Sequence, residues 1–218
     1  HLLHGGESLA SLEPMLQAVE QRAYSSGPRM ALGLLDQCER SMTKLGLNST
    51  DRRWGDVWLS RARLSLMVGD NQGANDWATR ARQVALREGW SSTVWIAQFY
   101  LAQVKIRRGE LQEAKEDLEA VSQSIPEGRD PEMMARVLFG LASIARYQHN
   151  FDQAFELYGE SCRYFAFAGR ADGEASCWRD MGALEISLGN SEKAEKLYKR
   201  AYLQYSKLGK RHEMANCV

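Results

Sequence analysis

The sequence predicts an all-α fold, a solenoid of about five antiparallel helix pairs stacked one on the next. Three observations predict it: a segment recurs every 40 residues, a turn signal divides and ends each period, and apolar residues between turns recur at helical spacing. Because a single helix pair cannot bury its own apolar stripe, neighbouring pairs have to stack.

The recurring segment ends in an alanine. Its four copies are Gly69–Ala74, Gly109–Ala114, His149–Ala154 and Gly189–Ala194, with alanines 40 residues apart, and a weaker copy ends at Ala31. Two antiparallel helices approach closely only where one presents a small residue to the other. We therefore expect these alanines at the helix–helix contacts, facing small residues of the first helices: Ala62, Ala102, Ala142 and Gly182.

The turn signals set the element boundaries. Turns inside the pairs are expected near residues 26–28, 69–70, 109–110, 149–150 and 189–190, and turns between pairs end at Gly46, Gly89, Gly128, Gly169 and Gly209. Glycine suits helix ends because it adopts positive φ without a steric penalty. The repeats are expected at about 12–54, 55–94, 95–134, 135–174 and 175–214 in one domain of residues 1–218, and the first helix of a sixth pair starts within 210–218.

Charge and hydropathy narrow the class of partner. Lys+Arg and Asp+Glu both number 28, so the formal net charge is zero, unlike that of a non-specific nucleic-acid binder. The longest uncharged stretch, Gly89–Val104, contains Ser, Thr and Gln and is shorter than the ~20 apolar residues of a transmembrane helix. We expect neither a nucleic acid nor a membrane as partner.

The four cysteines show no CxxC spacing and no histidine cluster (Cys38, Cys162, Cys177 and Cys217). Free thiols in an intracellular protein, cytoplasmic or nuclear, are the expectation, with disulfides as the alternative. Cys177 and Cys217 occupy equivalent positions one repeat apart, about 10 Å in packed helices, which is too far for a disulfide. With neither a secretory signal nor an initiator Met, the chain reads as part of something longer.

No group of residues predicts catalysis. The only close histidine pair is His1-x2-His4, His149 stands where a turn glycine is expected, and GxSxG, HExxH and Walker A motifs are missing. We therefore predict no catalytic residue, no metal site, no cofactor and no enzyme activity.

The repeat resembles the tetratricopeptide repeat (TPR), whose pattern is W-x2-L-G…G-[DN]-x3-A-x3-[YF]-x2-A. The last copy reads Trp178-x2-Met181-Gly182, then Gly189-Asn190-x3-Ala194-x3-Tyr198-x2-Ala201. The resemblance covers the whole chain, although a typical TPR has ~34 residues. It implies a right-handed superhelix in which the first helices of the pairs line a concave groove.

A narrower resemblance lies near the end of the chain. Gly169-Arg170-x3-Glu174-Ala175-Ser176-Cys177-Trp178 is echoed by Gly209-Lys210-x3-Met214-Ala215-Asn216-Cys217-Val218. This resembles the 40-residue arrays of NB-ARC/STAND-type signalling ATPases, and residues 51–125 are similar to the helical repeats of MalT-like regulators. In those proteins the array senses a ligand and an ATPase domain responds.

The TPR resemblance implies which residues line the groove. Counting back from the recurring alanines gives the binding candidates Arg63, Phe99, Gln103, Arg136, Phe139, Arg146, Tyr147 and Arg179, and the fifth repeat also places Ser176, Ala183, Ile186 and Ser187 there. Arginine and aromatic residues often dominate binding energy at interfaces, and arginine pairs well with carboxylates. A protein or peptide segment with acidic and apolar residues is the expected partner. Alternatively, the phenylalanines belong partly to the core and the arginines are merely solvated.

These features predict a protein–protein interaction module. One interpretation is the sensing array of a larger signalling ATPase, and the alternative is a scaffold subunit of the anaphase-promoting-complex or cohesin-loader type. A Walker A motif upstream of His1 would favour the first. We also expect self-association through the last repeat, since helix 190–209 should expose an apolar stripe: Ala194, Leu197, Tyr198, Ala201 and Tyr205.

Overall fold

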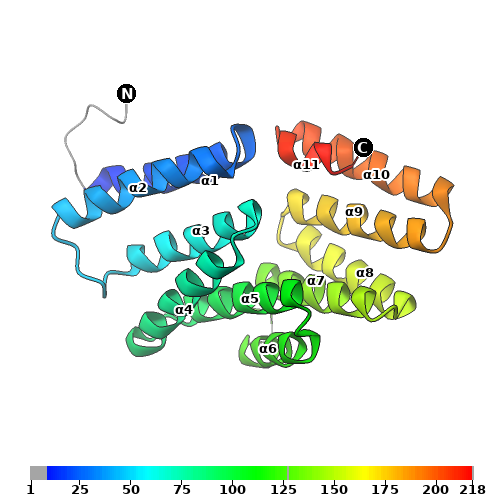
Figure 1. Ribbon diagram of the computed structural model, residues 1–218, viewed down its shortest axis with the longest axis horizontal. Coiled ribbons are helices and arrows are strands. Elements are labelled where there is room, and N and C mark those ends of the chain that lie inside the picture. Colours follow the sequence, from blue (N-terminus) through cyan, green and yellow to red (C-terminus); the bar gives the residue numbers. More distant parts are fainter. Residues whose placement is uncertain (1–8, 127, 218) are drawn as a thin grey trace. The chain divides into compact units, whose positions relative to one another are not determined.

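The computed structural model describes residues 9–126 and 128–217, and within these residues all regular secondary structure is helical (Figure 1). The predicted all-α fold of consecutive packed helix pairs is therefore confirmed. The chain divides into two compact units, one ending at Val104 and the other beginning at Lys105, within helix α5. A single solenoid spanning both units stays a prediction.

The first unit contains helices that pack on their neighbours in chain order. They are α1 (Leu9–Ser25), α2 (Pro28–Lys44), α3 (Arg52–Val68), α4 (Asn71–Glu88) and most of α5 (Ser91–Arg108). Helix α1 packs on α2, α2 on α3 and α3 on α4. Large side chains in the core of this unit include Leu35, Trp58 and Leu64, each at most 1% exposed.

The second unit repeats the same arrangement. Its helices are α6 (Leu111–Ser124), α7 (Pro131–Tyr147), α8 (Phe151–Phe167), α9 (Ala171–Ser187), α10 (Ser191–Lys207) and the short α11 (Arg211–Ala215). Each of these helices packs against the next one, and α7 also touches α9, so first helices of adjacent pairs are neighbours. The core here is built around Leu118, Tyr158, Leu184 and Tyr205.

The helix ends confirm the predicted turns. Gly69, Gly109 and Gly189 have positive φ between the helices of a pair, as do Gly46, Gly89, Gly128, Gly169 and Gly209 between pairs. His149 takes the same place with φ 61°, the one non-glycine residue of positive φ in the described chain. Helix starts are also encoded locally: the Asp130 carboxylate accepts a hydrogen bond from the Met133 amide at 2.9 Å, and Pro131 follows as the first helical residue.

The recurring alanines lie at the predicted helix–helix contacts. Ala31, Ala74, Ala114, Ala154 and Ala194 are all 0% exposed. Gly182, opposite them in the fifth repeat, is equally constrained, because a Cβ there would lie 3.3 Å from the ring of Tyr198. Only a small residue at this position lets α9 and α10 approach each other closely.

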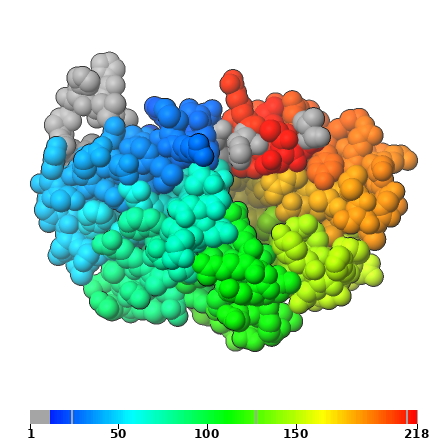
Figure 2. Space-filling view, viewed as in Figure 1, coloured from blue at the N-terminus to red at the C-terminus, as the bar shows by residue number. Residues whose placement is uncertain are grey.

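The predicted apolar stripe on α10 is wrong. Ala194, Ala201 and Tyr205 are at most 1% exposed, and Leu197 and Tyr198 are half-buried. Tyr205 and Ala201 cluster with Ala175 of α9, and Met214 and Cys217 pack on this cluster, so α11 covers one side of α10 (Figure 2). The residues that α10 does expose lie on another side, with Leu203 60% and Tyr202 37% exposed.

Candidate functional site

The eight predicted groove residues all lie on first helices of the pairs. Three belong to the first unit, Arg63 on α3 and Phe99 and Gln103 on α5; the remaining five are Arg136, Phe139, Arg146 and Tyr147 on α7 and Arg179 on α9. Since α7 and α9 are in contact, the structure brings these five residues onto two neighbouring helices.

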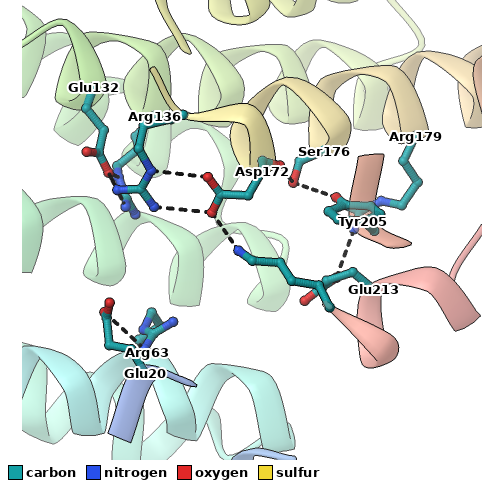
Figure 3. Close-up of polar contacts among 11 residues, drawn as sticks. Glu20, Arg63, Glu132, Arg136, Asp172, Ser176, Arg179, Tyr205 and Glu213 are labelled. Atoms are coloured by element: carbon teal, nitrogen blue, oxygen red, sulfur yellow. Dashed lines mark hydrogen bonds and ion pairs between the residues drawn. The ribbon is translucent and has the colours of Figure 1, made fainter. Parts of the chain in front are cut away.

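Three of the predicted arginines already pair with carboxylates of the chain (Figure 3). Arg63 Nη2 lies 3.3 Å from Glu20 Oε1, and Arg136 Nη2 lies 2.6 Å from Glu132 Oε1. Arg179 contacts Asp180 at 3.1 Å and Glu213 of α11 at 3.4 Å. Their side chains are only 15–27% exposed. These arginines are therefore neither fully solvated nor available as unpaired positive charges.

Two further ion pairs connect adjacent repeats in the second unit. Arg170 Nη1 donates to Glu132 Oε1 at 2.6 Å, and Lys210 Nζ donates to Asp172 Oδ2 at 2.7 Å. Arg170 and Lys210 are 40 residues apart in the sequence, as are Glu132 and Asp172, so the same contact is made twice. Sequence reasoning missed this pairing, although the echo of Arg170 by Lys210 was a visible signal.

Asp172 is the most strongly held of these carboxylates. It accepts hydrogen bonds from Lys210 and, at 3.1 Å, from Arg170 Nε. Burial disfavours its ionised form, but the hydrogen bonds from Arg170 and Lys210 outweigh that cost and hold the pKa of Asp172 well below its ordinary value. The carboxylate therefore has a structural role in joining α9 to the start of α11.

The two predicted phenylalanines contribute to the core. Phe99 is 8% exposed and its ring centroid lies 5.7 Å from that of Tyr100. Phe139 is half-buried and meets the ring of Tyr158 edge-on at 5.2 Å. The alternative that the sequence left open, partial membership of the core, describes both of them.

Arg146 and Tyr147 present a different environment at the end of α7. The Arg146 guanidinium carbon lies 4.7 Å from the Tyr147 ring centroid, and the Tyr147 side chain is 51% exposed. Arg146 Nε is buried, and among the residues the structure describes it has no hydrogen-bond partner. One repeat further on, Ile186 at the end of α9 is 53% exposed. This end of the α7–α9 pair thus combines exposed apolar groups with an unused donor.

A small cavity of about 330 Å³ lies along α9, next to this surface. Arg179, Asp180, Ala183, Tyr198 and Asn216 line it, so charges of both signs stand beside a tyrosine. The sequence placed Arg179 and Ala183 on the groove but gave no reason to include Tyr198 or Asn216, which come from α10 and the end of α11. Together, Arg146, Tyr147, Ile186 and this cavity form the surface that we call the α7–α9 surface.

A larger cavity of about 570 Å³ lies in the first unit, between α2, α3 and α4. Its aromatic walls are Trp54, Trp58 and Trp77. These rings are already engaged, because the Arg80 guanidinium lies 4.7 Å from the Trp58 ring centroid and Arg61 lies 5.1 Å from that of Trp77. Arg61 also donates to Glu39 at 2.6 Å. Because arginines of the chain itself contact these rings, we interpret the cluster as structural packing and not as a ligand site.

The described residues hold no group of three or more His, Cys, Asp or Glu side chains arranged to bind a metal ion. Within the same part of the chain no helix combines the length and apolar character needed to cross a membrane.

Stacked antiparallel helix pairs with a repeated Gly–Ala register define a helical-repeat fold like that of TPR proteins. Residues 133–207 match the tetratricopeptide repeat family. The chain has no significant match among curated protein sequences.

Solved structures of similar fold agree with this class. NprR in complex with its cognate peptide NprX aligns with a TM-score of 0.77 at 15% identity, over 94% of this chain and 59% of NprR. The apo form of RapI gives 0.61 at 11% identity, over 94% of this chain and 74% of RapI. The TPR-like repeats of a putative kinesin light chain from Podosopora anserina align with a TM-score of 0.56 at 19% identity, over 90% of this chain and 95% of that structure. At such low identity the likeness concerns the fold alone.

Proposed function

We propose that the chain is a non-catalytic interaction module whose α7–α9 surface binds a peptide segment of a partner protein. The observation that carries this proposal is the end of α7, where the Arg146 guanidinium lies 4.7 Å from the ring of the exposed Tyr147, with the exposed Ile186 one repeat further on in the neighbouring helix α9.

The chemistry of the surface indicates which peptide fits. An apolar side chain of the partner covers Tyr147 and Ile186, while a neighbouring carboxylate or backbone carbonyl accepts a hydrogen bond from Arg146. Aromatic and arginine residues in such positions commonly supply most of the binding energy. We therefore propose one acidic contact of the partner, with Arg146. Arg63, Arg136 and Arg179 already form ion pairs with carboxylates of this chain.

The likeness to NprR supports a peptide as ligand, because that structure holds NprR with its cognate peptide. For the biological context we propose the sensing array of a larger signalling ATPase, and a scaffold subunit of a multiprotein assembly remains the alternative. The full coding sequence decides between them: a Walker A motif supports the array, and further helical repeats alone support the scaffold.

Selection from a displayed library of random dodecapeptides tests the proposed binding. We expect enriched peptides that combine an apolar residue with an acidic one. The double variant Tyr147→Ser/Ile186→Ser should bind them at least tenfold more weakly, about 1.4 kcal/mol, in calorimetric titration.

The matched control removes an aromatic and an aliphatic side chain from another exposed surface. Phe167 of α8 and Leu203 of α10 are 81% and 60% exposed, so Phe167→Ser/Leu203→Ser should leave peptide affinity unchanged. Loss of affinity in the control alone, or a failure to enrich any peptide, would contradict the proposed site.

A further inference from the structure

Two cysteines of the second unit lie side by side across consecutive helices. Cys162 is on α8 and Cys177 is on α9, and these antiparallel helices pack closely after a short turn. Cys162 packs against the buried cluster that contains Cys177. Cys162 is half-buried, whereas Cys177 is 0% exposed. The pair therefore has one reachable sulfur and one sheltered sulfur.

The buried member is held in place by a chain of polar contacts. The Cys177 thiol donates to Ser161 Oγ at 3.4 Å, and Ser161 in turn donates to the Ala135 carbonyl at 2.8 Å. Phe165 and Ala135 pack around Cys177. These contacts hold the Cys177 side chain within the cluster against which Cys162 packs.

The surroundings of Cys162 favour its thiolate. Contact with the Cys177 thiol lowers the pKa of Cys162 in spite of partial burial, and the Trp178 indole N–H and the Arg200 guanidinium act in the same direction, against Glu174. Arg200 is placed there by its contact with Trp178, since its guanidinium carbon lies 3.8 Å from the ring centroid. Contact with Cys162 and burial raise the pKa of Cys177, so Cys177 keeps its proton.

We propose that Cys162 and Cys177 form an oxidation site at which hydrogen peroxide converts the two thiols into a disulfide joining α8 to α9. The Cys162 thiolate attacks one peroxide oxygen, the O–O bond breaks, and the departing hydroxide takes a proton to leave as water. The product is the sulfenic acid of Cys162. The Cys177 sulfur then attacks the Cys162 sulfur; the S–S bond forms, the S–O bond breaks, and hydroxide leaves with the Cys177 proton as a second water.

The other two cysteines are in surroundings that disfavour this reaction. Burial raises the pKa of Cys38 to about 11, and that residue lies in the core of the first unit. Burial also raises the pKa of Cys217, which lies at the far end of the second unit. Oxidation should thus select the Cys162–Cys177 pair from the four thiols.

The test treats the full chain, freshly reduced and desalted, with a small molar excess of hydrogen peroxide. We expect two of the four thiols to disappear, the intact mass to fall by two hydrogen atoms, and peptide mapping to show Cys162 linked to Cys177. Dithiothreitol should restore all four thiols. Retention of four thiols, or a linkage that involves another cysteine or a second molecule, would overturn the proposal.

Single variants separate the two steps. Cys177→Ser should stop at the sulfenic acid of Cys162, which dimedone labels, whereas Cys162→Ser should lose no thiol on the same timescale. Cys217→Ser is the control and should form the disulfide at the wild-type rate. A Cys162→Ser protein that loses two thiols as fast as wild type would also refute the assignment, and the wild-type peptide map decides the question if either variant fails to fold.

Discussion

Single charged residues on the first helices, or directly before them, hold adjacent repeats together. Arg63, Arg170, Arg179 and Lys210 each reach a carboxylate on the preceding or following first helix, over sequence separations of 34 to 43 residues. Surface ion pairs contribute little on their own, but partly buried and hydrogen-bonded ones contribute more. The chain's balanced charge is therefore arranged as specific contacts between repeats.

Asp172→Asn should lower the free energy of unfolding by about 1–3 kcal/mol at pH 7, because it removes the charge that holds Arg170 and Lys210. Since the pKa of Asp172 is depressed in the folded state, its stabilisation is complete above the unfolded value of ~3.9 and is lost as pH falls below it. Urea unfolding should show the difference between wild type and variant shrinking below about pH 4. Glu156→Gln, at an exposed position of α8, is the control; an equal loss of stability there would contradict the account.

At the level of residues, the sequence predicted features that depend on backbone conformation alone. It did not predict features that depend on a contact with a distant side chain. Glycines at positive φ were foreseeable because no other residue adopts that conformation as readily. Arg179, by contrast, pairs not only with the adjacent Asp180 but also with Glu213 on another helix, and no local pattern specifies that second partner. The repeat register thus predicted that Arg179 lies on a first helix, but not whether its charge was available.

At the scale of helices, close approach depends on a few small residues. A Cβ on Gly173, in the first turn of α9, would overlap the ring of Phe165 on α8. Phe165 is 7% exposed and packs with Ala135 and Cys177, so its ring has little room to move. This glycine sets the contact between the two helices that carry the cysteine pair.

Gly173→Ala should therefore destabilise the protein by about 1–3 kcal/mol, even though alanine favours helix. The matched change is Gly159→Ala on α8, where nothing lies within 4 Å of the added Cβ, and it should stabilise by up to about 1 kcal/mol. Thermal unfolding followed by circular dichroism measures both. If Gly173→Ala matched or exceeded the stability of Gly159→Ala, the close approach would be refuted.

His149 marks a helix end that is strained relative to its counterparts. It has φ 61°, whereas Gly69, Gly109 and Gly189 occupy the equivalent places. His149→Gly should raise the free energy of unfolding by up to about 1 kcal/mol, since glycine carries no Cβ penalty there. His149→Ala keeps the Cβ and should bring no gain. A net loss in the glycine variant would mean that the edge-on contact of His149 with Phe151, at 5.7 Å, outweighs the strain.

Helix positions were predictable from the sequence because turns and alanines recur with one period. The exposed side of α10 was not, since α11 covers Tyr205 and Ala201 while Leu203 faces outward. The proximity of Cys162 and Cys177 was also missed. A repeat register compares equivalent positions, whereas Cys162 lies on the second helix of one pair and Cys177 on the first helix of the next. Contacts across a turn depend on helix rotation, which periodicity alone does not define.

For the molecule as a whole, the central claim is that the α7–α9 surface takes the partner. The solved structures of similar fold share at most 19% identity with this chain, so they support the fold and not the location of the binding site. What distinguishes this surface is local: the Arg146 guanidinium contacts the exposed Tyr147 ring at the end of α7, and Ile186 is exposed at the equivalent end of α9.

Site-specific photo-crosslinking tests that claim most directly. A benzophenone amino acid is placed at Tyr147 in one protein and at Phe167, another exposed aromatic position, in a second one. Irradiation with a peptide selected by the wild-type chain should give a covalent adduct from position 147, suppressed by excess unlabelled peptide, and none from position 167. An adduct from position 167 with none from position 147 would place the partner on the second helices and contradict the account.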